Sequence, residues 1–288
     1  MKNKTVLITG SRGVIGKQLS LSLIRAGYKV VGTKRPRQNT IPNSSEIDII
    51  PWVVPCIDGF EIDVIVHLAA VYQTELSCDK IQLTNESNIG IATAISELAA
   101  IRKIPIIALG TFVEKYPGKN GLSYYANSKR IANGILVDFA SKFNLGLDYV
   151  YIYDSYSSDT SRGKFIDLLI NQNHGDAPIF ASGGYQMQDL VYIGDIIEAI
   201  SELIERNNQD KINSWQIRTG NETTLRELTE LLSEVKGFNL EVQWDHFPYG
   251  SRDVFKLWDC AENLLDFGKL IPMKERLSEI INKKKYII

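Results

Sequence analysis

The first half of the chain alternates short runs of aliphatic and β-branched residues with longer stretches of helical periodicity. The run Thr5–Thr9 predicts a strand, and the apolar residues between Ile15 and Ala26 fall on one face of a helix that Gly27 ends. Later strands are expected at Tyr28–Gly32, Glu46–Ile50, Asp63–Leu68, Ile104–Leu109 and Leu147–Ile152, and long helices at about Ile81–Ala100 and Ser123–Phe143. Strands that alternate with helices predict an α/β fold with a parallel, doubly wound sheet.

The pattern becomes less regular after residue 153. Residues Tyr153–Gly163 are rich in Ser, Asp and Gly, which predicts a loop. Shorter elements follow, with helices expected at Lys164–Asn171, Asp195–Glu205 and Thr224–Val235 and a strand at Leu190–Ile193. Thr224 and Glu227 have the spacing of a capping box at the start of the last helix. We expect one domain over residues 1–153 and a smaller lobe over residues 154–288, with some later segments returning to the sheet.

Composition and charge narrow the classes of partner. The chain has 32 Lys and Arg against 34 Asp and Glu, a net charge of −2, so no basic field favours nucleic acid or an acidic membrane surface. Its 3 cysteines form no CxxC pattern and its 3 histidines have no ligand spacing, so we expect packing cysteines and no metal. The chain shows no signal peptide and no apolar run of the ~18 residues that a membrane span needs, which favours a cytoplasmic protein.

A glycine-rich turn joins the first strand to the first helix. Its residues are Gly10, Ser11, Arg12, Gly13, Val14, Ile15 and Gly16. Glycines here allow a tight turn and let a pyrophosphate approach the amides at the helix N-terminus. A plain strand-to-helix turn is the alternative, but the position at the start of an alternating α/β chain favours dinucleotide binding.

The end of the second strand bears on the choice of nicotinamide cofactor. An acidic residue there would accept hydrogen bonds from the ribose 2′-hydroxyl and repel a 2′-phosphate, whereas this chain has Thr33, Lys34 and Arg35. Together with Arg12 of the glycine turn, these cations suit a phosphate. The sequence therefore predicts NADP(H), and the alternative is an ordinary solvated basic loop.

A phenol and an ammonium group are spaced for joint chemistry after the fifth strand. Tyr125 and Lys129 are four residues apart and share a helix face, and Thr111 lies just past the strand. A free tyrosine titrates near pH ~10, so a neighbouring positive charge is needed before it exchanges protons near neutrality. The YxxxK spacing also arises by chance, but its location predicts an active site. Tyr124 is the rival phenol, although its spacing of five takes it off the face of Lys129.

These motifs resemble those of the extended short-chain dehydrogenases/reductases, which include nucleotide-sugar epimerases, dehydratases and 4-ketoreductases. The segment that contains His67, Leu68, Ala69 and Ala70 is similar to the family's cofactor-lining stretch, and Asn88 is similar to a supporting asparagine. The resemblance implies a Rossmann domain that binds NADP(H) in residues 1–153 and a substrate-binding lobe in residues 154–288. It assigns catalysis to Thr111, Tyr125 and Lys129, and the last two also contact the cofactor.

Segments of the second half resemble the family's substrate-binding elements but depart from them in detail. Lys164 is similar to a lysine that opens the substrate lobe, and Arg252 to a late arginine that meets nucleotide phosphates. Gln188 stands where an arginine usually holds the diphosphate, Asp154 where an asparagine often contacts substrate, and Ser157 in place of a glycine. The implied substrate-binding residues are Asp154, Lys164, Gln188 and Arg252. We expect Asp154 to face a sugar hydroxyl or to pair with a cation such as Lys164.

Within the family, the short connection from Thr111 to Tyr125 most resembles CDP-paratose and CDP-abequose synthases. This implies NADPH-dependent reduction of a nucleotide-linked 4-keto-6-deoxy sugar, as in deoxysugar and O-antigen polysaccharide biosynthesis. It also implies a homodimer formed by the two long helices. One alternative is an epimerase with tightly bound cofactor, and another is a non-catalytic NADP-sensing protein. A dehydratase is less favoured because Phe112 and Val113 follow Thr111 where such enzymes carry Asp and Glu.

Overall fold

The structure is a computed structural model that describes residues 4–36, 38–41, 44–73, 75–118 and 123–285. The chain separates into two compact units. The first unit contains residues up to 152, 197–216 and 260–262, and the second contains 153–196, 217–259 and those from 263 onward. The polypeptide therefore returns to the first unit twice after leaving it.

The first unit is built on an eight-stranded sheet with the order β13-β10-β6-β5-β4-β1-β2-β3. Its strands are β1 (Thr5–Thr9), β2 (Lys29–Lys34), β3 (Ser45–Asp48), β4 (Val64–His67), β5 (Ile106–Thr111), β6 (Leu147–Ile152), β10 (Ile212–Ile217) and β13 (Glu262–Asn263). From β3 through β1 to β6 the neighbouring strands are parallel. The strand order reverses at β1, which is where open α/β sheets bind ligands. The predicted doubly wound α/β fold is confirmed.

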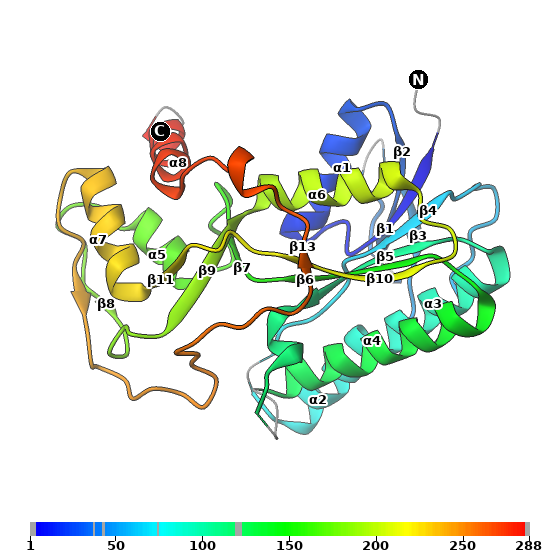
Figure 1. The fold of residues 1–288 in the computed structure, drawn as a ribbon, viewed down its shortest axis with the longest axis horizontal. Coiled ribbons are helices and arrows are strands. Elements are labelled where there is room, and N and C mark those ends of the chain that lie inside the picture. Colours follow the sequence, from blue (N-terminus) through cyan, green and yellow to red (C-terminus); the bar gives the residue numbers. More distant parts are fainter. Residues whose placement is uncertain (1–3, 37, 42–43, 74, 119–122, 286–288) are drawn as a thin grey trace. The chain divides into compact units, whose positions relative to one another are not determined.

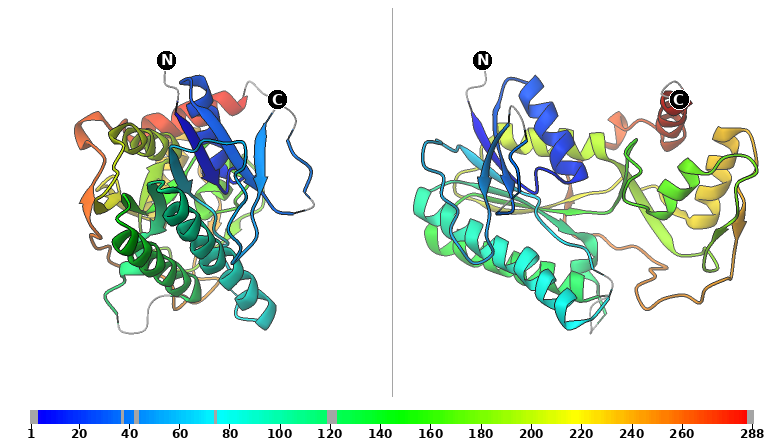
Figure 2. Two further views of the ribbon diagram at one scale, coloured as in Figure 1. Left: turned by 90° about the vertical axis from the view of Figure 1, so that its right-hand side faces the viewer. Right: turned by 180° about the vertical axis from the view of Figure 1, so that it is seen from behind.

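Helices cover both faces of this sheet (Figures 1 and 2). One face carries α1 (Val14–Arg25) and the later turns of α6 (Ile193–Arg206), and the other carries α3 (Ile91–Arg102) and α4 (Tyr124–Phe143). The Ser123 hydroxyl accepts the N–H of Ala126 at 3.1 Å and so caps α4, which ends where Asn144 adopts a left-handed conformation. The predicted span of this helix is confirmed.

The core of the first unit lies between the sheet and the helices α3 and α4. Leu7 and Ile65 on the strands and Ile95 on α3 are fully buried in one apolar cluster. All residues of β4 are buried, as expected for a central parallel strand that is covered on both faces. This packing holds the carboxyl ends of β1, β4 and β5 at one edge of a rigid sheet.

The second unit is assembled from shorter elements. One sheet has the order β11-β9-β7, formed by β11 (Glu222–Thr224), β9 (Met187–Tyr192) and β7 (Asp154–Tyr156), and another pairs β12 (Val242–Gln243) with β8 (Ile179–Phe180). The helices are α5 (Phe165–Asn171), α7 (Leu225–Lys236) and α8 (Met273–Lys285), with a 3-10 turn η3 (Phe267–Lys269). Leu169, Leu228 and Leu277, one from each helix, are fully buried in a shared core. The predicted capping box of Thr224 and Glu227 is confirmed.

The structure corrects several predicted elements. The long helix expected at Ile81–Ala100 is a continuous run of α2 (Cys78–Thr84), a π-helical turn η1 (Asn85–Gly90) and α3. The expected loop Tyr153–Gly163 contains β7, because these residues pair with β9, which is distant in sequence. The fifth strand runs on to Thr111 and is followed by a 3-10 turn η2 (Phe112–Lys115). No helix in the described part of the chain has the length and apolar character to cross a lipid bilayer.

Candidate active site

The glycine turn between β1 and α1 is packed closely enough to form a dinucleotide cradle. Gly10 has a φ of 71°, which glycine adopts without strain. A Cβ on Gly16 would lie 2.2 Å from the carbonyl oxygen of Gly10, and a Cβ on Gly10 would lie 2.9 Å from the backbone nitrogen of Ala69. Gly13 is the N-cap of α1, and the first turn of this helix carries no acidic residue. The turn therefore fits a pyrophosphate bound at the helix N-terminus.

A buried polar cluster joins the ends of β1 and β4. Thr9 Oγ1 accepts the N–H groups of Leu68 and Ala69, each at 3.2 Å, and lies 2.7 Å from His67 Nδ1. Because this hydroxyl already accepts two hydrogen bonds, it donates its proton to Nδ1, which places the imidazole proton on Nε2. Burial and the charge of Lys129 lower the pKa of His67 to about 3. His67 is thus a neutral support for the segment of residues 68–70 that was predicted to line the cofactor.

Two of the three cations predicted to bind a 2′-phosphate are already paired. The Nε and Nη2 atoms of Arg12 each lie 2.8 Å from a carboxylate oxygen of Glu46, and the bond from Arg12 lowers the pKa of Glu46. Lys34 pairs with Asp48, whereas the side chain of Arg35 is exposed. Neither Glu46 nor Asp48 was predicted as a partner, because both lie on β3, the parallel neighbour of β2, and not on β2 itself.

The structure brings Lys129 and Thr111 to the carboxyl end of β5, and Tyr125 lies on the same helix as Lys129. Thr111 is the last residue of that strand, and Lys129 of α4 is buried with its Nζ donating to the carbonyl oxygen of Leu109 at 2.6 Å. The ring of Tyr125, one helical turn before Lys129, packs edge-on against Tyr72 with centroids 5.0 Å apart. The connection between Thr111 and Tyr125 includes residues 119–122, which lie outside the described residues.

A buried carboxylate that was not predicted from the sequence lies near Thr111 and Lys129. Glu114 on η2 is 3% exposed, and its Oε1 accepts the Thr111 N–H at 2.7 Å. Burial and the charge of Glu114, with a smaller contribution from Tyr72, raise the pKa of Tyr125. In the protein without cofactor the pKa of Tyr125 is therefore raised, and its lowering by a neighbouring positive charge stays a prediction. The signal for Glu114 in the sequence was an acidic residue three positions after Thr111, where the fifth strand ends.

The neighbouring polar residues hold α4 and the loop after β4 in place. Asn88 accepts the N–H of Val71 at 2.7 Å and donates to the Ser128 hydroxyl at 2.9 Å, which are contacts of the supporting kind that the resemblance implied. The rival phenol, Tyr124, donates to Asn85 on the π-helical turn at 2.8 Å. This bond engages the hydroxyl of Tyr124, which leaves Tyr125 as the candidate acid.

The predicted substrate residues all lie in the second unit. Lys164 Nζ lies 3.5 Å from a carboxylate oxygen of Asp154, which is one of the two arrangements that the sequence left open for this acid. Gln188 is on β9. Met187, the residue before it, donates its N–H to the carbonyl oxygen of Val254 at 2.7 Å. This bond places the exposed Arg252 segment beside the strand that carries Gln188.

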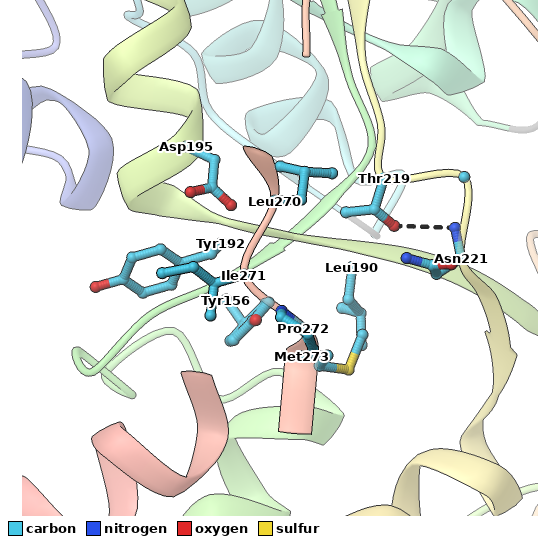
Figure 3. A pocket seen from close by; sticks show the side chains of 11 residues that line it. Tyr156, Leu190, Tyr192, Asp195, Thr219, Asn221, Leu270, Ile271, Pro272 and Met273 are labelled. Carbon is cyan, nitrogen blue, oxygen red and sulfur yellow. Dashed lines mark hydrogen bonds between the residues drawn. The ribbon is translucent and has the colours of Figure 1, made fainter. Parts of the chain in front are cut away.

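The second unit also contains a cavity of about 450 Å³ (Figure 3). Tyr192 and Asp195 line it, and the Thr219 hydroxyl on its wall accepts the N–H of Asn221 at 3.1 Å. The guanidinium of Arg276 has its Nη2 atom 3.6 Å from a carboxylate oxygen of Asp195 and its Cζ atom 4.7 Å from the centre of the Tyr192 ring. None of the predicted substrate residues lines this cavity, so it is separate from the residues that the sequence assigned to the substrate.

Comparison with known proteins places this site in a family. The chain belongs to the NAD dependent epimerase/dehydratase family, which it matches over residues 6–217. The predicted resemblance to the extended short-chain dehydrogenases/reductases, and with it the prediction of a nicotinamide-dependent enzyme, is confirmed. In the described residues no cluster of side chains is suited to a metal ion.

Several relatives act on sugar nucleotides according to their names. The CDP-abequose synthase of Yersinia pseudotuberculosis is 28% identical over 82% of this chain and 86% of its own length, and that of Salmonella muenchen is 26% identical over 81% and 80%. A putative UDP-glucose 4-epimerase of Methanocaldococcus jannaschii is 24% identical over 97% and 98%. The solved UDP-glucose 4-epimerase of Thermotoga maritima, in complex with UDP-glucose, shares the fold with a TM-score of 0.78 and 19% identity over 99% of this chain and 100% of its own.

Proposed function

We propose that this chain is an NADPH-dependent reductase of a nucleotide-linked 4-keto-6-deoxy sugar. The observation that carries the proposal is the bond from the buried Lys129 of α4, the helix that also carries Tyr125, to the carbonyl of Leu109, two residues before Thr111 at the carboxyl end of β5. The likeness to two CDP-abequose synthases supports reduction among the reactions of the family. In this proposal the first unit binds the cofactor and the second binds the sugar nucleotide.

The first unit supplies a site for the cofactor. The glycine turn, residues 10–16, holds the pyrophosphate, and residues 68–70 line the dinucleotide beyond it. When bound, the reduced nicotinamide supplies a hydride. Lys129, anchored by its 2.6 Å bond to Leu109, directs its positive charge toward the cofactor ribose and the phenol of Tyr125.

The chain's own part in the chemistry is proton transfer and orientation. The Thr111 hydroxyl donates a hydrogen bond to the sugar carbonyl oxygen, and Tyr125 transfers its proton to that oxygen. Asn88 keeps α4 in register with the loop after β4 through its bond to Ser128. These roles need one proton donor per turnover and no metal.

We assign substrate binding to Asp154, Lys164, Gln188 and Arg252 of the second unit. Arg252 is the diphosphate anchor, because its guanidinium suits phosphate oxygens and Gln188 carries no charge. The pairing of Lys164 with Asp154 balances the carboxylate that would otherwise repel a diphosphate. Asp154 is then left to bind a sugar hydroxyl.

The preference for NADP(H) over NAD(H) is also part of the proposal. The exposed Arg35 is available to a 2′-phosphate, and Lys34 forms a partly exposed ion pair, for which a phosphate can compete. Arg12 is held more firmly, because two of its nitrogens bind the two oxygens of the Glu46 carboxylate, whose side chain is 3% exposed. Glu46 opposes the preference, because its carboxylate repels a 2′-phosphate and is suited to a ribose hydroxyl.

A homodimer through α3 and α4 completes the proposal. Ile101 on α3 and Ile131 on α4 are apolar yet 63% and 52% exposed, and Phe143 at the end of α4 is 41% exposed. Apolar residues gathered on two adjacent helices are typical of a two-fold interface. Light scattering over a range of protein concentrations tests this, and a monomer mass throughout would rule it out.

An epimerase is the second candidate, supported by the likeness over nearly the whole chain to a putative UDP-glucose 4-epimerase. Such an enzyme uses the same tyrosine and lysine but oxidises and then reduces the sugar, so it consumes no cofactor. The third possibility, a protein that only senses NADP, has no need of a phenol beside a buried ammonium.

The decisive experiment is to incubate the full chain with NADPH and a panel of CDP- and dTDP-linked 4-keto-6-deoxy sugars, and to identify the products by mass spectrometry. We expect a gain of two mass units in the sugar and stoichiometric loss of NADPH absorbance. Interconversion of two sugar nucleotides without net loss of NADPH would replace this proposal with the epimerase. Cofactor binding without any turnover would favour the sensing protein.

A further inference from the structure

The cavity of the second unit has a volume of about 450 Å³, within the range of roughly 300–1,000 Å³ that is usual for small-molecule sites. All of its lining residues belong to the second unit, and none of them was predicted to bind the cofactor or the substrate. The reaction proposed above therefore uses none of the side chains that Figure 3 shows around this cavity.

One wall of the cavity is built from neighbouring strands. Tyr156 on β7 and Tyr192 on β9 are opposite each other in the parallel register, with ring centres 5.7 Å apart. Because side chains alternate between the two faces of a strand, Leu190 lies on the same face as Tyr192. Asp195, in the first turn of α6, adds a carboxylate. This wall thus combines aromatic, aliphatic and acidic groups.

A second wall is fixed in place by Asp189, which is 1% exposed on β9. Its carboxylate accepts the N–H and the hydroxyl of Thr219, each at 2.8 Å, and the N–H of Gly220 at 2.9 Å. The backbone of residues 219–221 is therefore held at the edge of the cavity, where Asn221 is exposed. Residues 270–273, which lead into α8, supply an apolar part of the lining.

Tyr156 supplies a polar group that lacks a partner. The residue is 2% exposed, and its hydroxyl makes no hydrogen bond to any residue that the structure describes. A buried tyrosine hydroxyl usually has a partner, because an unpaired polar group costs free energy in the folded chain. Burial raises the pKa of this phenol, so it remains a donor at neutral pH. A ligand in the cavity that accepts this proton would satisfy the group.

The charges around the cavity favour an uncharged ligand. Among the described residues of the lining, Asp195 alone carries a charge, and Nη2 of Arg276 lies 3.6 Å from its carboxylate. A phosphate would meet this carboxylate with no cation in the same lining, which is unfavourable. A cationic ligand would compete with Arg276, whose Cζ also lies 4.7 Å from the centre of the Tyr192 ring. An uncharged ligand avoids both conflicts.

We propose that this cavity is a second small-molecule site, which binds an uncharged, hydroxylated ligand of the saccharide class. The hydroxyl groups of a saccharide can donate to a carboxylate and accept from a phenol, while its C–H face packs on aromatic and aliphatic side chains. Asp195, Tyr156 and Asn221 supply the polar groups of the lining, and Leu190 and residues 270–273 supply the apolar surface. The inference goes beyond the proposed function and does not depend on it, because it involves neither cofactor nor turnover.

Saturation-transfer NMR on the full chain tests the site with a panel of uncharged methyl hexosides and methyl 6-deoxyhexosides. Each glycoside is supplied at up to about 10 mM, which detects dissociation constants in the millimolar range. We expect at least one member of the panel to bind. If none of them binds, the inference is overturned.

Filling the cavity places the bound glycoside. Ile271→Trp introduces an indole at a lining position that is 37% exposed, so the fold can accept the change. We expect it to weaken binding by at least about tenfold, or ~1.4 kcal/mol, because the indole takes up the volume of the ligand. Leu168→Trp is the matched control, since Leu168 is 43% exposed on α5 and lies outside the lining. Equal binding by the two variants would show that the glycoside binds elsewhere.

Tyr156→Phe separates ligand binding from a structural role of the phenol. We expect binding to weaken by about three- to tenfold, the scale of one hydrogen bond. The melting temperature without glycoside should stay the same or rise, because the change removes a hydroxyl that has no partner in the fold. A lower melting temperature together with unchanged glycoside binding would mean that the phenol serves the fold alone, and the inference fails.

Cytidine 5′-diphosphate and Arg252→Ala separate the cavity from the residues proposed to bind substrate. We expect neither to change glycoside binding. If cytidine 5′-diphosphate displaces the glycoside, or if Arg252→Ala weakens its binding, the glycoside occupies the proposed substrate site and the inference is overturned. Glycoside binding that follows Ile271→Trp and Tyr156→Phe as expected, in a chain that reduces no keto sugar, supports the inference and counts against the proposed function instead.

Discussion

Each unit buries a cation, but the two cations are held in different ways. In the second unit the guanidinium of Arg218 contacts three carboxylates directly, at 3.1, 2.8 and 2.9 Å, from Asp189, Glu222 and Asp259. Burial lowers its pKa, but these bonds raise the pKa of Arg218 overall. In the first unit the ammonium of Lys129 is bound to a backbone carbonyl, and Glu114 acts on it through space.

The difference separates a structural charge from a chemical one. Asp189 accepts hydrogen bonds from Arg218, from the N–H and hydroxyl of Thr219 and from the N–H of Gly220, so every part of the network is committed to holding the second unit together. A lysine ammonium has three protons, and for Lys129 one is directed at Leu109, so the others can serve the cofactor contact that we propose. The comparison predicts that changes at the two cations have opposite consequences for stability and turnover.

The largest effect is expected for Arg218→Leu. Removal of the guanidinium leaves the fully buried Asp189 without its cation, which should lower the free energy of unfolding by about 3–5 kcal/mol. Denaturant unfolding of the full chain measures this. Exposed Arg130→Leu on α4 is a suitable control, and a loss as small as the control's would show that Arg218 does not hold the second unit together.

Tyr125→Phe should have the converse profile. We expect turnover to fall by at least ~10²-fold, the usual scale for a positioned acid, while the melting temperature and cofactor affinity stay close to those of the native chain. Tyr124→Phe, which loses only the bond to Asn85, should be milder. The reverse ranking of these two variants would place the acid on Tyr124.

The buried His67 makes the stability of the chain depend on pH. Its pKa of about 3 is below that of a free histidine, so the folded chain keeps the ring neutral while the unfolded chain binds a proton below pH ~6.5. The stability that results is complete above pH ~6.5 and is lost as the pH falls below that value. Roughly 2 kcal/mol should be lost between pH 6.5 and 5, since one pKa unit corresponds to about 1.4 kcal/mol. His67→Asn should flatten this part of the stability curve. An equal slope in both proteins would show that other groups cause the loss.

The smallest effect is expected for Glu46→Gln at the edge of the first unit. The change frees Arg12 and removes a negative charge near the proposed 2′-phosphate, so the ratio of NADP(H) to NAD(H) affinity should rise by up to about tenfold, or ~1.4 kcal/mol. Calorimetry at two salt concentrations measures the ratio. A fall in the ratio would mean that Glu46 does not oppose the phosphate.

Much of the first unit could be predicted because its signals are local. A parallel strand is a short apolar run, and the turn at residues 10–16 carries its three glycines within seven consecutive residues. The α4 helix shows its N-cap at Ser123 and the four-residue spacing of Tyr125 and Lys129 within one segment. Such features are read from neighbouring residues, so they were placed within a few residues of their observed positions.

The second half of the chain was harder to predict because its elements depend on distant partners. Asp154–Tyr156 becomes strand β7 only by pairing with β9, and Ile212–Ile217 becomes β10 only by joining the sheet of the first unit. Asp154–Tyr156 is too short to indicate a strand alone, and Ile212–Ile217 lacks the apolar run or regular alternation that would do so. Their structure is set by hydrogen bonds to strands that lie far away in the sequence.

The sequence by itself determined the fold class, the glycine turn and the candidate residues Thr111, Tyr125 and Lys129. The periodicity of apolar residues and the short spacings within a motif can both be read from residues that are close together in the chain. Only the tertiary structure decided which charges meet. The parallel register of β2 and β3 brought Glu46 to Arg12, and the packing of η2 against β6 placed Glu114 beside Tyr149 and behind Thr111. Electrostatic energies depend on distance and burial, and the order of residues along a chain specifies neither until the chain has folded.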